Sequence, residues 1–144
     1  MRLEMDCVRE ILLCVEENTG LRKRCRFIDE SLNASQEFLG EIKAPAEYQE
    51  PLTKKYGNDT LIYHINYCIQ AGLLEKAATS NGYVIVISDL TPNGHSFVEN
   101  IRDNKIWAGV KGVAVKVGSK SLEAVIQIAS NVITELIRSQ FQLG

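Results

Sequence analysis

The chain has 144 residues, of which 45% are hydrophobic and 24% are charged, and its net charge is −2. These values are typical of a single globular domain with a sizeable core. The slightly acidic balance excludes a protein whose whole surface is strongly basic, although it leaves room for a local basic patch that binds nucleic acid.

The N-terminal segment "MRLEMDCVRE" lacks the apolar core of a signal peptide, so we expect a cytoplasmic protein with free thiols. No two cysteines have the C-x-x-C spacing, which disfavours a structural zinc site and favours buried thiols. Charged and amide side chains interrupt the most hydrophobic stretch, 121–141, so it is not expected to cross a membrane. Because the cysteine spacing offers no metal site and the sequence has no cofactor-binding motif, we expect no metal and no cofactor. The cysteines are Cys7, Cys14, Cys25 and Cys68.

The first predicted helix covers residues 3–18, where apolar residues recur at the three- and four-residue spacing of one helix face. Residues 19–46 lack such a pattern, and we interpret them as an insertion that lies over the core. The insertion contains the basic run "RKRCR" at 22–26, which we interpret as a solvated charge run. A very short helix is predicted at 51–56, which begins with Pro51 and follows Pro45.

A helix of about a dozen residues is predicted from Asn58, as its cap, to near Gly72, which suits a left-handed C-cap. At 100° per residue, the side chains that share the direction of Ile65 form its buried face. The polar and aromatic side chains point the other way. The buried face comprises Leu61, Ile62, Ile65, Cys68 and Ile69, and the outward face comprises Thr60, Tyr63, Asn66, Tyr67 and Gln70.

Two strands are predicted next, over 73–79 and 83–88. The pair Asn81-Gly82 between them is preferred in two-residue hairpin turns. A further helix begins with Thr91 as its N-cap and Pro92 at its first position. Its buried stripe is predicted to contain Phe97, Val98 and Ile101.

Residues 104–117 place Ile106, Trp107, Val110 and Val113 on one helix face, and a clearer helix capped by Ser121 covers 121–141. The apolar arc of this last helix is about 200° wide, roughly twice the stripe of an ordinary surface helix. Either a second copy of the chain covers part of the arc in a symmetric dimer, or residues 105–117 and the insertion cover it within one chain. The arc comprises Leu122, Val125, Ile126, Ala129, Val132, Ile133, Leu136 and Ile137.

The order helix, short helix, helix and two-stranded ribbon is that of a winged helix, so we expect an α+β fold. The segments "MRLEMDCVREILLCVEENTG", "LIYHINYCIQAGLLEK", "LTPNGHSFVENIRDNKIW" and "KVGSKSLEAVIQIASNVITELI" resemble the DUF twenty-five-thirteen family over nearly the whole chain. The resemblance implies a small bacterial, phage-associated protein with a winged-helix-like domain, and it transfers no functional residues. We expect that domain at 1–103, followed by a helical extension at 104–144 that packs on the same core or at a dimer interface.

Binding of duplex DNA is the leading functional hypothesis, by analogy with the fold. The helix that ends at Gly72 would hold the recognition position, where asparagine and glutamine can read adenine. Its outward face carries no Lys or Arg, however, and DNA affinity depends largely on neutralised phosphates. The alternative is protein–protein interaction, as a homodimer or with a host factor, because an outward tyrosine pair suits an interface. The candidate binding residues are Lys54, Lys55, Thr60, Tyr63, Asn66, Tyr67, Gln70 and Lys76, and the dimer candidates are the residues of the apolar arc.

Catalysis is not expected, because the sequence has no phosphate-binding loop, dinucleotide fingerprint or nucleophile elbow. His64 and His95 are expected to be partly buried residues that form hydrogen bonds, since a catalytic imidazole needs an arranged partner. The absence of these motifs favours a non-enzymatic protein, and the family resemblance implies a regulatory or accessory factor of phage or mobile-element origin. No small-molecule substrate is evident.

Overall fold

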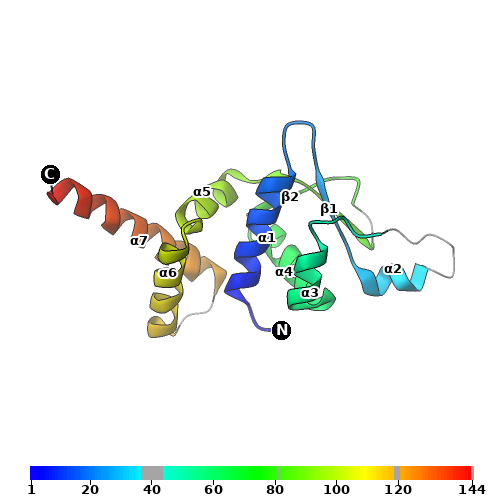
Figure 1. The fold of residues 1–144 in the computed structure, drawn as a ribbon, viewed down its shortest axis with the longest axis horizontal. Helices are drawn as coiled ribbons and strands as arrows, with labels where there is room; N and C mark the ends of the chain where they lie inside the picture. The colour runs from blue at the N-terminus through cyan, green and yellow to red at the C-terminus, as the bar shows by residue number, and fades with distance from the viewer. Residues whose placement is uncertain (37–43, 81, 119–120, 144) are drawn as a thin grey trace.

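The computed structural model describes residues 1–36, 44–80, 82–118 and 121–143. These residues form an α+β fold in which helices pack around a small antiparallel sheet (Figure 1), and this confirms the expected fold class. Two helices follow residue 103, also as expected. The helices are α1 (Met5–Asn18), α2 (Glu30–Gln36), α3 (Glu50–Tyr56), α4 (Asn58–Gln70), α5 (Pro92–Ile101), α6 (Asn104–Val117) and α7 (Leu122–Leu143), and the strands are β1 (Cys25–Ile28), β2 (Leu74–Lys76) and β3 (Val84–Leu90).

The sheet has the strand order β1–β3–β2, and it includes a strand that the sequence did not predict. Strand β1 is antiparallel to β3, with Cys25 opposite Ile87 and Ile28 opposite Val84. The side chains of Cys25, Phe27 and Ile28 are fully buried. Residues 25–28 therefore belong to the core sheet, which corrects the interpretation of 19–46 as an insertion over the core.

The pairing of β2 with β3 is shorter than predicted. Lys76 lies opposite Ile87, and a bulge between Glu75 and Lys76 shifts the register of the preceding pairs. Beyond Lys76, the Ser80 hydroxyl accepts a hydrogen bond from the Val86 amide at 2.8 Å and donates one to its carbonyl at 3.1 Å. The Val86 carbonyl also accepts from the Ala77 amide at 2.7 Å, so the serine hydroxyl replaces the ladder bond that the Val86 amide would donate to a longer β2. Asn81, and with it the predicted hairpin turn, lies outside the described residues.

Helix α4 ends as predicted but begins differently. Gly72 has φ +77° and donates to the Ile69 carbonyl at 3.1 Å, while the Leu73 amide reaches the Cys68 carbonyl at 3.0 Å. This pair of bonds closes the helix in a left-handed C-cap. At the other end Gly57, rather than Asn58, occupies the cap position.

Helix α5 begins where the sequence predicted. The Thr91 hydroxyl accepts a hydrogen bond from the Gly94 amide at 3.0 Å, and Pro92 stands at the first position of the helix. Phe97, Val98 and Ile101 are buried, which confirms the predicted stripe.

Helices α6 and α7 extend the core of the preceding elements. Trp107 and Val110 are buried as predicted, whereas the next buried position is Ala114, since Val113 is 38% exposed. The first turns of α7 also join the core, and the Ser121 hydroxyl caps the helix by accepting from the Ala124 amide at 3.1 Å. The second half of α7 projects away from the body of the molecule (Figure 1). The predicted extension therefore shares the core over α6 and the first half of α7.

Candidate functional site

The outward face of α4, which we call the α4 face, presents the predicted tyrosine pair. Tyr63 is 40% exposed, and its ring centroid lies 6.2 Å from that of Tyr67, which is partly buried against the core. Asn66 and Gln70 are exposed and Thr60 is half-buried. The opposite face is buried, which confirms the predicted helix phase: Leu61, Ile65 and Cys68 are fully buried, and Ile62 and Ile69 are partly buried.

The α4 face carries no cation. The helix contains Asp59 but neither Lys nor Arg, and its C-terminal end forms a groove with the start of α7. Among the residues that line this groove, Glu123 alone is charged. A DNA phosphate would therefore meet a neutral to acidic surface here, where little affinity is available. The groove is lined by Tyr67, Gln70, Ala71, Leu122, Glu123, Ile126 and Gln127.

The predicted lysines flank the two ends of α4. Lys54 and Lys55 lie on α3 and Lys76 lies on β2, so they are separated by roughly the length of α4, about 20 Å. The Lys55 ammonium is 3.0 Å from the Glu10 carboxylate and so is already paired. Lys54 and Lys76 are exposed and form no ion pair with any residue that the structure describes.

The two histidines differ in environment. His64 is fully buried, so the expectation of partial burial was wrong. Its Nε2 accepts from the Glu4 amide at 2.8 Å and its Nδ1 lies 2.7 Å from the Thr60 carbonyl, which fixes the neutral tautomer with the proton on Nδ1. The ring thereby ties the start of α1 to α4. His95 is exposed rather than partly buried, and its Nε2 lies 3.4 Å from the Asp89 carboxylate.

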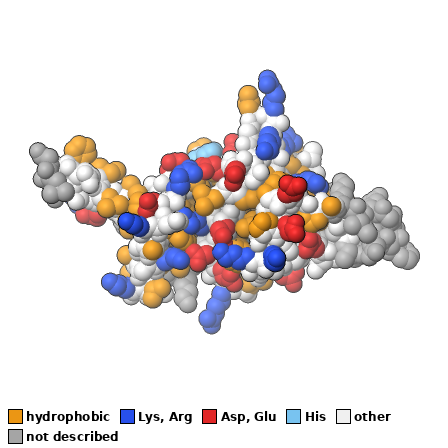
Figure 2. Space-filling model, in the orientation of Figure 1, with side chains coloured by type: hydrophobic (Ala, Val, Ile, Leu, Met, Phe, Trp, Pro, Cys, Tyr) orange, Lys and Arg blue, Asp and Glu red, His pale blue; other side chains and the backbone are white. Residues whose placement is uncertain are grey.

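A tight hairpin at residues 19–24, which we call the basic hairpin, joins α1 to β1 and projects from the molecule (Figure 1). Gly20 and Lys23 exchange backbone hydrogen bonds of 2.9 and 3.2 Å, which leaves Leu21 and Arg22 at the turn. Arg22, Lys23 and Arg24 are all exposed, and Leu21 is 94% exposed. Figure 2 shows a hydrophobic side chain next to a basic one at the end of this projection, with further basic side chains below them.

The basic hairpin and the β2–β3 connection lie at opposite ends of β3. The hairpin precedes Cys25, which pairs with Ile87 in the middle of β3, whereas residues 77–83 precede Val84 at its start. The two therefore extend beyond opposite ends of the paired segment, in which Cys25 lies about 10 Å along the strand from the residue that faces Val84. In Figure 1 the basic hairpin and α3 lie at opposite edges of the molecule, so the hairpin cations do not join Lys54 and Lys55 in one positive face. Lys76 is nearer, two strands across the sheet and about 10 Å from β1.

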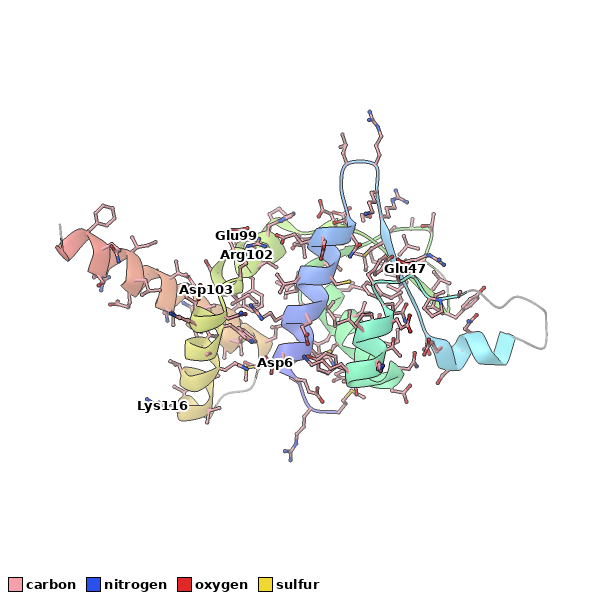
Figure 3. The ribbon with its side chains drawn as sticks, in the orientation of Figure 1. Asp6, Glu47, Glu99, Arg102, Asp103 and Lys116 are labelled. Atoms are coloured by element: carbon pink, nitrogen blue, oxygen red, sulfur yellow. The ribbon has the colours of Figure 1, made fainter. Side chains whose placement is uncertain are left out.

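Several other cations are neutralised by carboxylates. Arg102 lies 2.6 Å from Glu16 and 2.6 Å from Glu99, and its hydrogen bond to Glu16 holds the pKa of that carboxyl below its ordinary value. Figure 3 shows Glu99 and Arg102 side by side at the end of α5. Lys111 pairs with Asp6 at 3.0 Å, and Arg138 pairs with Glu135 at 2.9 Å. In contrast, no described carboxylate lies within ion-pair distance of Arg22, Lys23 or Arg24.

The dimer candidates on α7 divide into two groups. Leu122, Val125 and Ala129 are buried within the chain, because α5 and α6 pack against them, so a partner molecule cannot reach them. This corrects their assignment to an interface surface. Ile126, Val132 and Ile133 are partly buried, whereas Leu136 and Ile137 are 46% and 52% exposed.

The cysteines are free thiols in apolar surroundings. Cys7, Cys25 and Cys68 are buried, and burial raises the pKa of each thiol to about 12. Burial likewise raises the pKa of Cys14 to about 11. Thiols that stay protonated at neutral pH are weak nucleophiles. No metal-binding group of three or more His, Cys, Asp or Glu side chains occurs in the described ranges.

The helices were compared with the length and hydropathy of a membrane-spanning segment. None of the helices in the described part of the chain combines the length and apolar character that a bilayer-spanning segment requires.

Comparison with known proteins gives a family but no activity. The chain is similar to an uncharacterized protein of Haemophilus influenzae, with 28% identity over 85 residues that cover 57% of this chain and 72% of the relative. No solved structure matches it. The family model described as "Hypothetical protein (DUF2513)" matches residues 2–120, from the start of the chain to the end of α6, and the chain therefore belongs to the DUF2513 family.

Proposed function

We propose that this chain is a winged-helix protein that binds duplex DNA and catalyses no reaction. On this proposal it is a regulatory or accessory factor of phage or mobile-element origin that acts in the cytoplasm of a bacterial host. The order of the strands in the sheet, taken with the helix that precedes β2, is the observation that carries the proposal.

In a winged helix the first strand lies between the first two helices and pairs with the last strand of the ribbon. Here β1 follows α1, α3 and α4 come next, and β2 and β3 complete a sheet of order β1–β3–β2. Helix α4 would then hold the recognition position, and residues 77–83 would form the wing. The presence of β1, which was not part of the sequence-based expectation, adds support to this assignment. Helix α2 is an addition to it.

Binding to DNA should appear as a steep dependence on salt. We expect the full chain to bind a fluorescent duplex of random sequence, and log Kobs to fall linearly with log salt between about 50 and 200 mM, because each neutralised phosphate releases counterions. Fluorescence anisotropy measures this directly. A folded protein that fails to bind the duplex at about 50 mM salt would contradict the proposal.

A second candidate function, self-association, is favoured by the exposed apolar side chains on the second half of α7. Leu136, Ile137 and Phe141 are 46%, 52% and 83% exposed on a helix that projects from the body (Figure 1). Two such helices packed antiparallel about a two-fold axis would cover the apolar side chains of both copies with the same surface, as an isologous contact does.

Replacing Ile137 with glutamate is expected to weaken self-association on the order of 100-fold, because an unpaired carboxylate would be buried at the interface. Sedimentation velocity over a range of protein concentrations measures the change. Ser139→Glu is the matched control, since it adds the same charge on the opposite side of the same helix and should leave the dimer intact. A wild-type protein that sediments as a monomer at all concentrations would remove this candidate.

A further inference from the structure

The geometry points to the basic hairpin, rather than the α4 face, as the main DNA-contacting element of this protein, with Leu21 entering the minor groove. This inference rests on the proposed DNA binding and names the surface that would perform it. A helix and a wing are the usual contacts for such a fold, whereas the basic hairpin lies between α1 and β1, at the other end of the sheet from residues 77–83.

The basic hairpin gathers positive charge that is not neutralised by the protein. Arg22, Lys23 and Arg24 are consecutive, exposed and free of ion pairs with the described residues, and Arg26 follows on the same side of β1 as Arg24. The α4 face, by comparison, offers no Lys or Arg. Since phosphate neutralisation supplies most non-specific affinity for DNA, the greater part of that affinity would come from the hairpin.

The basic hairpin is held in place by contacts at its base. The Thr19 hydroxyl donates to the Val15 carbonyl at 2.7 Å, and β1 begins directly after the hairpin with the fully buried Cys25. The Tyr48 hydroxyl accepts from the Arg26 amide at 2.7 Å and donates to its carbonyl at 3.0 Å. An element that is already ordered loses little conformational entropy when it binds.

The tip of the basic hairpin combines an apolar side chain, Leu21, with a cation, Arg22, and this pairing suits a DNA groove. Leu21 is 94% exposed, and proteins that bind the minor groove commonly insert leucine between base steps while arginine and lysine hold the flanking phosphates. The hairpin also forms a shallow hollow with Glu75 and Ser88 on the sheet. A phosphate in this hollow would face the hairpin cations and the Ser88 hydroxyl, with Glu75 opposing it.

The decisive variant combines Arg22→Gln, Lys23→Gln and Arg24→Gln. Losing three phosphate contacts should reduce the slope of log Kobs against log salt by about 2.7, which corresponds to about 500-fold weaker binding at 0.1 M salt when the affinity at 1 M is unchanged. A control with Arg2→Gln, Lys105→Gln and Lys116→Gln makes the same change in net charge at other exposed positions, and should keep the wild-type slope. Thermal unfolding should be nearly the same for both, because surface substitutions without partners change stability by about 0.5 kcal/mol or less.

Two single variants test the arrangement within the basic hairpin. Leu21→Ala should weaken binding about tenfold without changing the salt slope, because it removes apolar contact and no charge. Glu75→Gln should strengthen binding a few-fold, since it removes a carboxylate that opposes the phosphate. These two shifts, in opposite directions, would not arise from damage to the fold.

The outcomes separate the inference from the proposed function. If the wild type binds DNA and the triple hairpin variant keeps its slope, the basic hairpin is not the contact and the proposed function survives. If the wild type does not bind DNA at about 50 mM salt, both fail. If it instead sediments with vesicles of anionic phospholipid, and the triple variant does not, the basic hairpin is a membrane-surface element and the inference is overturned.

Discussion

Replacing Gly94 with alanine is expected to destabilise the protein by about 3 kcal/mol or more, and to lower the melting temperature by about 10 °C. A Cβ atom at this position would lie 2.1 Å from the carbonyl oxygen of Leu73. The obstacle is backbone, and the same carbonyl accepts a hydrogen bond from the Thr91 amide at 3.0 Å, so it cannot simply turn aside. The first turn of α5 would have to move away from the segment that joins α4 to β2.

The control for Gly94 is the same substitution at Gly109. That residue lies within α6 and is exposed, and a Cβ atom added to it would meet no neighbouring atom within 4 Å. Alanine there should raise stability by about 0.5–1 kcal/mol, because glycine is a poor helix former. Thermal unfolding followed by circular dichroism measures both variants. Equal melting temperatures for the two would show that the close approach of α5 to Leu73 does not constrain the fold.

Local signals in the sequence predicted several features of the fold correctly. The glycine at position 72, the threonine at 91 and the serine at 121 each act within a few residues of the helix end that they define. The phase of α4 followed from the spacing of its apolar residues, because the core buries the face on which they lie. Such features need no knowledge of the rest of the chain.

The features that sequence reasoning missed depend on partners far away in the chain. Strand β1 has only four residues, follows a basic run, and becomes a strand by pairing with β3. The basic hairpin was interpreted as a solvated charge run because nothing local indicated that β1 would hold it as a projection. The burial of His64 likewise depends on the distant Glu4 amide.

The width of the apolar arc on α7 predicted that more than one surface covers it. It did not predict which of its residues are buried within the chain and which stay exposed. The sequence indicated that one face of a small domain could not bury it all. The structure buries the first turns against α5 and α6 and leaves Leu136 and Ile137 exposed. The length of α7 that α5 and α6 cover depends on how these helices pack, and the spacing of apolar residues within α7 carries no information on that packing.

Replacing Gln49 with leucine is expected to destabilise the protein by about 3 kcal/mol or more, although leucine has a similar volume. Gln49 is fully buried beside the free edge of β1, where its Oε1 accepts from the Ile28 amide at 2.8 Å and its Nε2 donates to the Ile28 carbonyl at 2.7 Å. Leucine would leave both backbone groups buried without partners, and each costs about 1–3 kcal/mol. Urea unfolding measures the difference in free energy of unfolding.

Tyr48→Phe is the matched control, because Tyr48 makes the same two kinds of hydrogen bond to the neighbouring Arg26 on the same strand edge. Arg26 is exposed, so water can reach its backbone in place of the lost hydroxyl, and the expected cost is about 1 kcal/mol or less. Because both side chains make two hydrogen bonds to the edge of β1, a difference in the loss of stability between the two variants measures the effect of burial. If the two variants lose equal stability, then Gln49 does not act by satisfying a buried strand edge, and water must reach Ile28 as readily as Arg26.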